Sequence, residues 1–206
     1  VLYNIFGAAY KGLGQLDAAI EAYSKALAIE PENAQFYSNM GVVIQEQGKL
    51  EEAMEAYNKA LAIKPDYAKA YNNMGSVLKD QGKLEEAIEA YSKALAIKPD
   101  FADGYNNMGV VLQEQGNLEE AIEAYNKARA IKPDHLGAYN NMGSVFDDQG
   151  KLEESIAAYS KALVIKPDYE PARAAKLYLQ AYICDWDSIA TDIKLIPKLG
   201  TFETHV

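Results

Sequence analysis

The sequence predicts an all-α solenoid of helix–turn–helix units that ends in a C-terminal capping helix pair. The prediction rests on residues that recur every 34 positions: one set of prolines, two sets of glycines and one set of alanines. The positions are Pro31, Pro65, Pro99, Pro133 and Pro167; Gly7, Gly41, Gly75, Gly109 and Gly143; Gly14, Gly48, Gly82, Gly116 and Gly150; and Ala26, Ala60, Ala94, Ala128 and Ala162. A fixed period in this range is typical of a solenoid, in which each unit packs only on its neighbours.

The first helix of each unit carries one apolar stripe at the i, i+3, i+4, i+7 spacing of an α-helix. In the third unit the stripe consists of Tyr71, Met74, Gly75 and Leu78. The helix ends at Gly82, a residue suited to the left-handed conformation just past a helix end. Ala70 and Val77 fall beside the stripe, where they can contact the neighbouring unit.

The second helix begins at Leu84-Glu85-Glu86, with acidic residues in the first turn, where the helix dipole favours negative charge. Gly75 and Ala87 are small enough to let the two helices approach, and Tyr91 fills the space beside them. In the fifth unit Ser155 replaces that alanine, a change that the packing tolerates. Pro99 follows the end of the second helix, and we expect Asp100 to cap the next one.

These signals divide the chain into five units and a cap. The boundaries are 1–33, 34–67, 68–101, 102–135, 136–169 and 170–206, the first unit being truncated at its N-terminus. The cap has a first helix from Glu170, the segment 184–187 in place of a glycine turn, and a second helix over 188–195. We expect Trp186 and Cys184 to pack this cap against the fifth unit, and the last residues to begin a linker to a downstream domain.

Each 34-residue unit contains, in this order, an aromatic residue, Gly, Gly, Ala, a second aromatic residue, Ala and Pro. Over residues 1–169 this pattern resembles the tetratricopeptide repeat (TPR). The resemblance implies a right-handed superhelix whose first helices line a concave groove. It also implies that the groove binds a peptide or a protein.

Paired asparagines mark each first helix, as in the segment 71–75, Tyr-Asn-Asn-Met-Gly. A helical projection places Asn73 opposite the core, which the resemblance makes the groove floor, and places Asn72 on a polar shoulder with Lys79. Stacked units then align Asn39, Asn73, Asn107 and Asn141 as a ladder of amides able to hold the backbone of an extended peptide. Further candidates are Asn72, Asn106, Asn140, Gln45, Lys69, Lys79 and Gln113. In the alternative interpretation the asparagines bridge neighbouring first helices and bind no ligand.

The charge and composition of the chain limit the classes of partner that it can bind. The formal net charge of −10 argues against binding to nucleic acid or to an anionic membrane surface, and no apolar run is long enough to span a bilayer. Acidic residues outnumber basic ones in the predicted groove, so we expect a neutral to basic extended segment as partner. One cysteine forms no intramolecular disulfide, which fits a cytoplasmic protein.

No motif in the sequence predicts catalysis, a cofactor or a metal site. The chain has two histidines, and neither a C-x-x-C, an H-x-x-x-H nor a glycine-rich phosphate loop occurs. His135 takes the place of Tyr67 and Phe101 in other units, so we expect it to fill an aromatic packing position. The second histidine, His205, lies near the end of the chain.

The segment Ile183-Cys184-Asp185-Trp186, directly after the asparagine-bearing units, resembles the junction between repeats and catalytic domain in O-linked N-acetylglucosamine transferases and their bacterial relatives. That resemblance implies a substrate-recognition region of a larger glycosyltransferase.

Two other hypotheses remain. One is a scaffold that self-associates through the solenoid ends, where Leu2, Ile5 and Phe6 lack partners; the other is a regulatory segment that holds no substrate.

Overall fold

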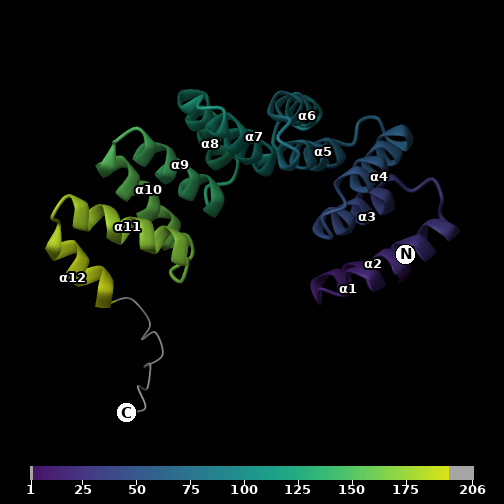
Figure 1. Ribbon diagram of the computed structural model, residues 1–206, viewed down its shortest axis with the longest axis horizontal. Coiled ribbons are helices and arrows are strands. Elements are labelled where there is room, and N and C mark those ends of the chain that lie inside the picture. Colours follow the sequence, from purple (N-terminus) through teal and green to yellow (C-terminus); the bar gives the residue numbers. More distant parts are fainter. Residues whose placement is uncertain (1, 195–206) are drawn as a thin grey trace, which may run out of the picture. The chain divides into compact units, whose positions relative to one another are not determined.

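The computed structural model describes residues 2–194, and all regular elements in this range are α-helices (Figure 1). They are α1 (Leu2–Gly12), α2 (Leu16–Ile29), α3 (Ala34–Glu46), α4 (Leu50–Ile63), α5 (Ala68–Asp80), α6 (Leu84–Ile97), α7 (Ala102–Glu114), α8 (Leu118–Ile131), α9 (Leu136–Asp148), α10 (Leu152–Ile165), α11 (Glu170–Tyr182) and α12 (Trp186–Lys194). The predicted all-α class is confirmed for these residues. Three sequence features lie outside the described residues: the predicted linker, the predicted end of the last helix at Leu195, and His205.

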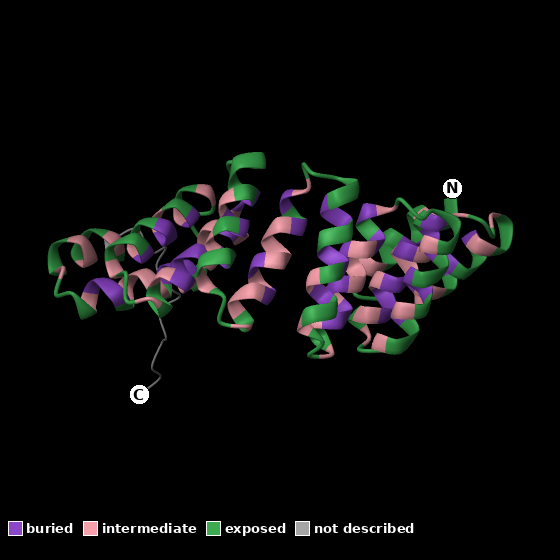
Figure 2. Ribbon diagram, turned by 90° about the horizontal axis from the view of Figure 1, so that it is seen from above, coloured by how far each residue is buried: buried purple, intermediate pink, exposed green. Residues whose placement is uncertain are grey.

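The chain divides into two compact units, residues 1–124 and residues 125–206. The boundary falls inside α8, so the first unit contains α1 to α7 and the start of α8. The second contains the rest of α8 and α9 to α12. In each unit the buried residues gather on the sides by which neighbouring helices face one another (Figure 2).

Glycine and tyrosine set the distance between the two helices of a pair, as predicted. A Cβ added at Gly75 of α5 would lie 2.7 Å from Cε1 of Tyr91 on α6, and that ring is 1% exposed. The same fit joins Gly143 of α9 to Tyr159 of α10 in the second unit, again at 2.7 Å. In that pair the hydroxyl of Ser155 donates to the carbonyl of Gly143 at 2.7 Å, which explains how serine replaces alanine inside the packing.

The turn glycine adopts the left-handed conformation that the sequence predicts, with φ of +74° at Gly82. The backbone N–H of Lys83 then donates to the carbonyl of Leu78 at 2.9 Å and closes the helix end. In the last pair Cys184 takes this position with φ of 58°, and the N–H of Asp185 closes α11 in the same way. The turn therefore matches those of the glycine units, but it is shorter than the predicted segment 184–187: α12 begins at Trp186, before the predicted start at residue 188.

Two local expectations about helix starts need correction or extension. Phe101, not Asp100, is the N-cap of α7, and its side chain makes no capping hydrogen bond. His135 is buried as predicted for its aromatic position, but it also caps α9, because its Nδ1 accepts the backbone N–H of Ala138 at 3.0 Å. Asn33 caps α3 from the corresponding place.

The expectation that Trp186 and Cys184 pack the cap against the preceding helices is wrong. Trp186 is 62% exposed, and Cys184 is exposed as well. Trp186 is the first residue of α12 and occupies a place that holds half-buried leucines, such as Leu84 and Leu152, in earlier pairs. A position shaped for leucine leaves the larger indole in solvent.

Candidate functional site

A hollow of about 440 Å³ lies in the first unit, over the first helices α3, α5 and α7. Its lining residues are Val42, Gln45, Glu46, Asn72, Asn73, Ser76, Asp80 and Asn107. The lining is mostly polar, and it combines side-chain amides with two carboxylates. Four of the residues that the sequence predicted as candidates, Gln45, Asn72, Asn73 and Asn107, therefore come together here.

In the first unit, Asn39, Asn73 and Asn107 each reach back to the preceding first helix. The amide Nδ2 of Asn107 donates to Oδ1 of Asn72 at 3.1 Å. Asn39 makes the corresponding bond to Asn4 at 3.0 Å, and Asn73 approaches the hydroxyl of Ser38 at 3.5 Å. These contacts are the bridges of the alternative interpretation, and they show that the asparagines of this unit help to stack the first helices.

The helical projection placed Asn72 on a polar shoulder with Lys79, but in the structure Asn72 is buried. The residue is 8% exposed, because the next first helix stacks over it and places Asn107 against its side-chain oxygen. A projection of one helix shows only the direction toward its own partner helix. It does not show which side the next unit covers.

Gln45 is held rigidly at the edge of the hollow. Its Nε2 donates to the hydroxyl of Ser76 at 3.1 Å and to the carboxylate of Asp80 at 2.9 Å, while its Oε1 accepts from the hydroxyl of Tyr57 at 3.2 Å. Burial raises the pKa of Tyr57 well above its ordinary value, with the charge of Glu46 adding to the effect, so the phenol remains a donor at neutral pH. The hollow therefore has a preorganised wall.

Two lysine ion pairs lie beside the hollow. Lys11 contacts the carboxylate of Glu46 at 3.0 Å, and Lys79 contacts Asp80 at 3.2 Å. Both pairs are partly exposed, so water and salt screen them strongly. A cationic ligand can thus compete with these lysines for the two carboxylates.

The remaining predicted residues lie outside the lining of this hollow. Lys69 is exposed on α5, and Asn39, Asn106 and Gln113 are half-buried on α3 and α7. Asn140 and Asn141 belong to the second unit, where Nδ2 of Asn140 donates to Oδ1 of Asn141 at 3.4 Å.

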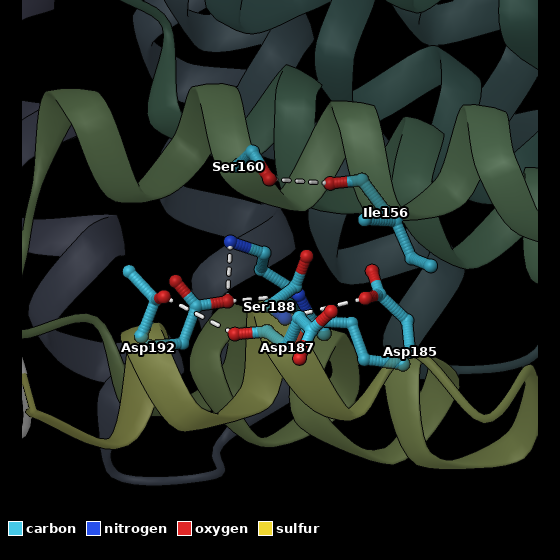
Figure 3. Close-up of a pocket in the computed structure, with 9 residues that line it drawn as sticks. Ile156, Ser160, Asp185, Asp187, Ser188 and Asp192 are labelled. Carbon is cyan, nitrogen blue, oxygen red and sulfur yellow. Dashed lines mark hydrogen bonds and ion pairs between the residues drawn. The ribbon is translucent and has the colours of Figure 1, made fainter.

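A second polar hollow, which the sequence analysis missed, lies in the second unit between α10, α11 and α12. Its volume is also about 440 Å³, and its lining includes Lys176, Gln180 and Asp192. Figure 3 shows Ser160 on α10 facing Ser188 and Asp192 on α12 across this hollow. Alignment of the cap with the 34-residue period could have revealed it, because polar residues there replace apolar ones.

Across residues 2–194, histidine, cysteine and carboxylate side chains form no group of three or more that could hold a metal ion. No helix in this range combines the length and the apolar character that crossing a bilayer requires.

Protein-family models match most of the chain. A model described as "TPR repeat" matches residues 7–48, 46–82 and 75–116, and a model described as "Tetratricopeptide repeat" matches residues 100–168. The chain belongs to the tetratricopeptide-repeat family. The TPR fold is a non-catalytic interaction module, and the TPR resemblance seen in the sequence is confirmed.

Solved structures agree with this assignment. A crystal structure of MamA is 30% identical, with a TM-score of 0.65, covering 78% of this chain and 94% of MamA. PilF of Pseudomonas aeruginosa is 23% identical, with a TM-score of 0.81, covering 94% of this chain and 89% of PilF. YrrB, described as a TPR protein with an unusual peptide-binding site, is 24% identical, with a TM-score of 0.62, covering 84% of this chain and 90% of YrrB. The last two show the fold alone. A search of curated protein sequences found no match.

Proposed function

We propose that this TPR protein binds an extended, neutral to basic peptide segment in the hollow of its first unit. The observation that carries the proposal is the position of Asn73. Its side chain lines the hollow, and in the described part of the chain its amide makes a single long hydrogen bond of 3.5 Å, to Ser38. One amide N–H and the carbonyl oxygen are therefore available to a peptide backbone, which offers the complementary acceptor and donor.

The charge of the hollow supports a neutral to basic partner. The carboxylates of Glu46 and Asp80 line it, and the two lysines that contact them do not. An acidic segment would meet like charge at both residues. A lysine or arginine on the peptide would be attracted to them.

The bridging asparagines constrain the experiment that tests this proposal. Replacing Asn107 removes the donor to buried Asn72, so a loss of binding in that variant could reflect a loss of stacking. Asn73→Ala is cleaner because the bond that it removes is long. Asn58, an exposed asparagine on α4, supplies the matched control Asn58→Ala.

Immobilised ten-residue peptide pools of neutral, basic and acidic composition provide the probe. We expect the wild-type chain to bind the neutral and basic pools better than the acidic pool. Asn73→Ala should weaken binding about 5- to 10-fold, which corresponds to the loss of about one hydrogen bond, and Asn58→Ala should leave it unchanged. Equal binding by all three proteins, or a preference for the acidic pool, would refute the proposal.

We propose further that this region selects substrates for a larger glycosyltransferase-like protein in the cytoplasm. The support is the segment 183–186, which resembles the corresponding junction in O-linked N-acetylglucosamine transferases. The test is the coding sequence beyond residue 206. A glycosyltransferase domain there would support the proposal, and a different domain would refute it.

A second candidate function is self-association through α1, and the exposed apolar side chains of that helix favour it. Leu2 is 60% exposed and Ile5 is 56% exposed. Phe36, which takes the place of Leu2 in the next pair, is 5% exposed. Light scattering over a concentration series tests this function. Replacing Leu2 and Ile5 by serine should abolish any dimer, and a wild-type chain that stays monomeric at high concentration would contradict it.

A further inference from the structure

Asn72 combines burial with a hydrogen-bond donor that the fold does not use. The residue is 8% exposed, and its Oδ1 accepts the amide N–H of Asn107 at 3.1 Å. Its Nδ2 makes no hydrogen bond to any residue that the structure describes. A side-chain amide carries two N–H groups, and leaving them without an acceptor at so buried a position is costly.

The unused donor opens into the hollow of the first unit. Asn72 lines that hollow, and its Nδ2 is not among the described side-chain atoms that the fold both seals from solvent and leaves without a partner. A group that enters the hollow can therefore reach Nδ2. Because an N–H donates, that group has to bring an acceptor, and the carbonyl oxygen of a peptide is one.

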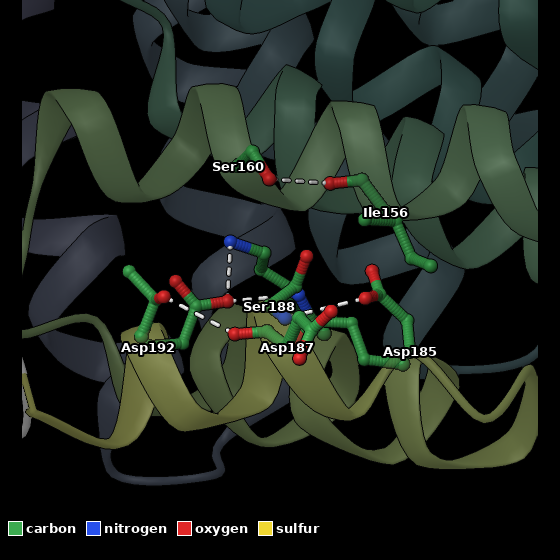
Figure 4. Close-up of polar contacts among 9 residues, drawn as sticks. Ile156, Ser160, Asp185, Asp187, Ser188 and Asp192 are labelled. Atoms are coloured by element: carbon green, nitrogen blue, oxygen red, sulfur yellow. Dashed lines mark hydrogen bonds and ion pairs between the residues drawn. The ribbon is translucent and has the colours of Figure 1, made fainter.

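The second hollow, between α10, α11 and α12, differs in this respect. Its polar residues satisfy one another, because Lys176 and Nε2 of Gln180 both contact Oδ2 of Asp192, at 2.8 Å and 2.9 Å (Figure 4). Oε1 of Gln180 has no partner, but it is sealed from solvent, so a ligand cannot reach it. The accessible donor of Asn72 therefore sets the first hollow apart.

Asn72 is the first of three polar residues that form a stripe on α5. Ser76 follows one turn later and Asp80 two turns later, so the three side chains lie on one face of the helix, and all of them line the hollow. The hydroxyl of Ser76 accepts from Gln45 at 3.1 Å, and its own proton has no acceptor among the described residues. The stripe therefore runs from two donors to a carboxylate over about 12 Å, at about 1.5 Å per residue.

The carboxylate end of the stripe favours a guanidinium over an ammonium. Glu46 of α3 and Asp80 both line the hollow, and Lys11 and Lys79, which contact them at 3.0 Å and 3.2 Å, do not. A lysine of a ligand would offer each carboxylate only what these two lysines already offer. A guanidinium is more weakly hydrated and presents several N–H groups in a planar fork, so one group can bridge both carboxylates.

The space between the two ends suits an aliphatic stem. Val42 precedes Glu46 by one turn on α3 and is the apolar residue of the described lining, which is otherwise polar. Arginine packs its methylene groups on apolar surface while its charged end remains in polar surroundings.

We propose that this hollow selects an arginine residue of the bound peptide. The backbone carbonyl of the arginine accepts from Nδ2 of Asn72 and from the hydroxyl of Ser76. Its stem lies along Val42, and its guanidinium binds the carboxylates of Glu46 and Asp80. The inference rests on the proposed peptide binding, to which it adds a preferred side chain and a residue, Asn72, that fixes the position of the peptide.

Peptides that differ only at their central residue test the preference by fluorescence anisotropy. That residue is arginine, lysine or citrulline, the uncharged analogue of arginine, in an otherwise neutral chain of alanine and serine. We expect the arginine peptide to bind about 5- to 10-fold more tightly than the citrulline peptide, the size of one or two partly exposed ion pairs, with lysine between them. Added salt should reduce the difference.

Variants separate the two ends of the site. Glu46→Gln and Asp80→Asn should bring the arginine and citrulline affinities closer together, whereas Glu52→Gln, at an exposed acid of α4 outside the hollow, should not. Asn72→Ala should weaken both peptides by the same factor, about 5- to 10-fold, because it removes a contact to the backbone. Asn107→Ala breaks the same bridge between helices and keeps Nδ2 of Asn72, so it should weaken binding less.

The outcomes distinguish this inference from the proposed function. If the arginine and citrulline peptides bind equally, the inference is overturned and the peptide binding stands; if neither binds, both are refuted. Equal affinities for arginine and lysine would overturn the choice of a guanidinium. Equal losses in Asn72→Ala and Asn107→Ala would mean that Asn72 acts only in stacking.

A measurement on the unmodified chain keeps the test decisive if a variant folds poorly. In the NMR spectrum of the isotope-labelled chain, the side-chain amide signal of Asn72 should shift on titration with either the arginine or the citrulline peptide. A signal that does not move while the peptide binds would overturn the assignment of Asn72.

Discussion

Replacing Gly75 by alanine should destabilise the first unit, although alanine is the better helix former. The new Cβ would lie 2.7 Å from Cε1 and 2.8 Å from Cζ of Tyr91, distances that require the ring or the helix to move. The ring is 1% exposed and closely packed, so it has little room to move aside. The steric cost therefore opposes the gain in helix propensity.

The two effects can be compared in size. Alanine in place of glycine inside a helix gains about 0.8–1.0 kcal/mol, and overpacking a close-packed core costs about 1–3 kcal/mol. We expect a net destabilisation of roughly 1 kcal/mol, which lowers Tm by about 2–4 °C for a chain of this size. A Cβ added at Gly12, in the same unit, would meet no atom within 4 Å, so Gly12→Ala should be neutral or stabilising.

Urea denaturation followed by circular dichroism measures both variants, and a double-mutant cycle identifies the cause. Tyr91→Leu removes the two closest ring atoms, so combining it with Gly75→Ala should cost less than the sum of the single changes. If Gly75→Ala proves as stable as Gly12→Ala, the tyrosine does not limit the approach of α5 and α6, and the packing argument fails.

Three further predictions follow from burial. Asn107→Ala leaves Oδ1 of Asn72, a residue 8% exposed, without its donor, and should cost about 1–3 kcal/mol by urea denaturation; a loss below about 0.5 kcal/mol would contradict the bridge. Burial raises the pKa of Tyr159 from 10.0 to about 12, so its contribution to stability is complete below pH 10 and decreases as pH rises toward 12. The urea midpoint of the wild-type chain should fall over that pH interval, and the midpoint of Tyr159→Phe should fall less. If the two midpoints fall equally with pH, the raised pKa of Tyr159 does not contribute to stability. Trp186 is 62% exposed, so Trp186→Ala should change stability by less than about 0.5 kcal/mol, and iodide should quench its fluorescence efficiently; a protected indole would show that it packs.

The sequence predicted the helix pairs well because their determinants are local. The apolar stripe around Gly75 follows from the helical period, and the left-handed turn at Gly82 follows from the absence of a side chain. The contact between Gly75 and Tyr91 involves a small and a large residue that each recur at a fixed place. These features can be read from one 34-residue unit.

The sequence alone did not predict the surroundings of the polar side chains. Asn72 and Asn73 are neighbours in the chain and both line the hollow, yet Asn72 is buried and accepts a hydrogen bond from Asn107, whereas Asn73 makes only a long contact to Ser38. That difference depends on how the next first helix rotates and stacks, which a projection of one helix does not contain. The wrong expectation for Trp186 has the same origin, because an aromatic residue is buried only where neighbouring helices leave enough space.

The sequence by itself therefore determined the repeat, its two helices, its turn and the small residues that let the helices pack. Only the tertiary structure decided which amides bridge neighbouring helices and which remain available, and it alone joined Lys176, Gln180 and Asp192 into one cluster. The physical reason is the separation along the chain over which each kind of interaction acts. Backbone conformation and helical periodicity act within a few residues, whereas the partners of a polar side chain come from helices that the chain brings together only after those elements have packed.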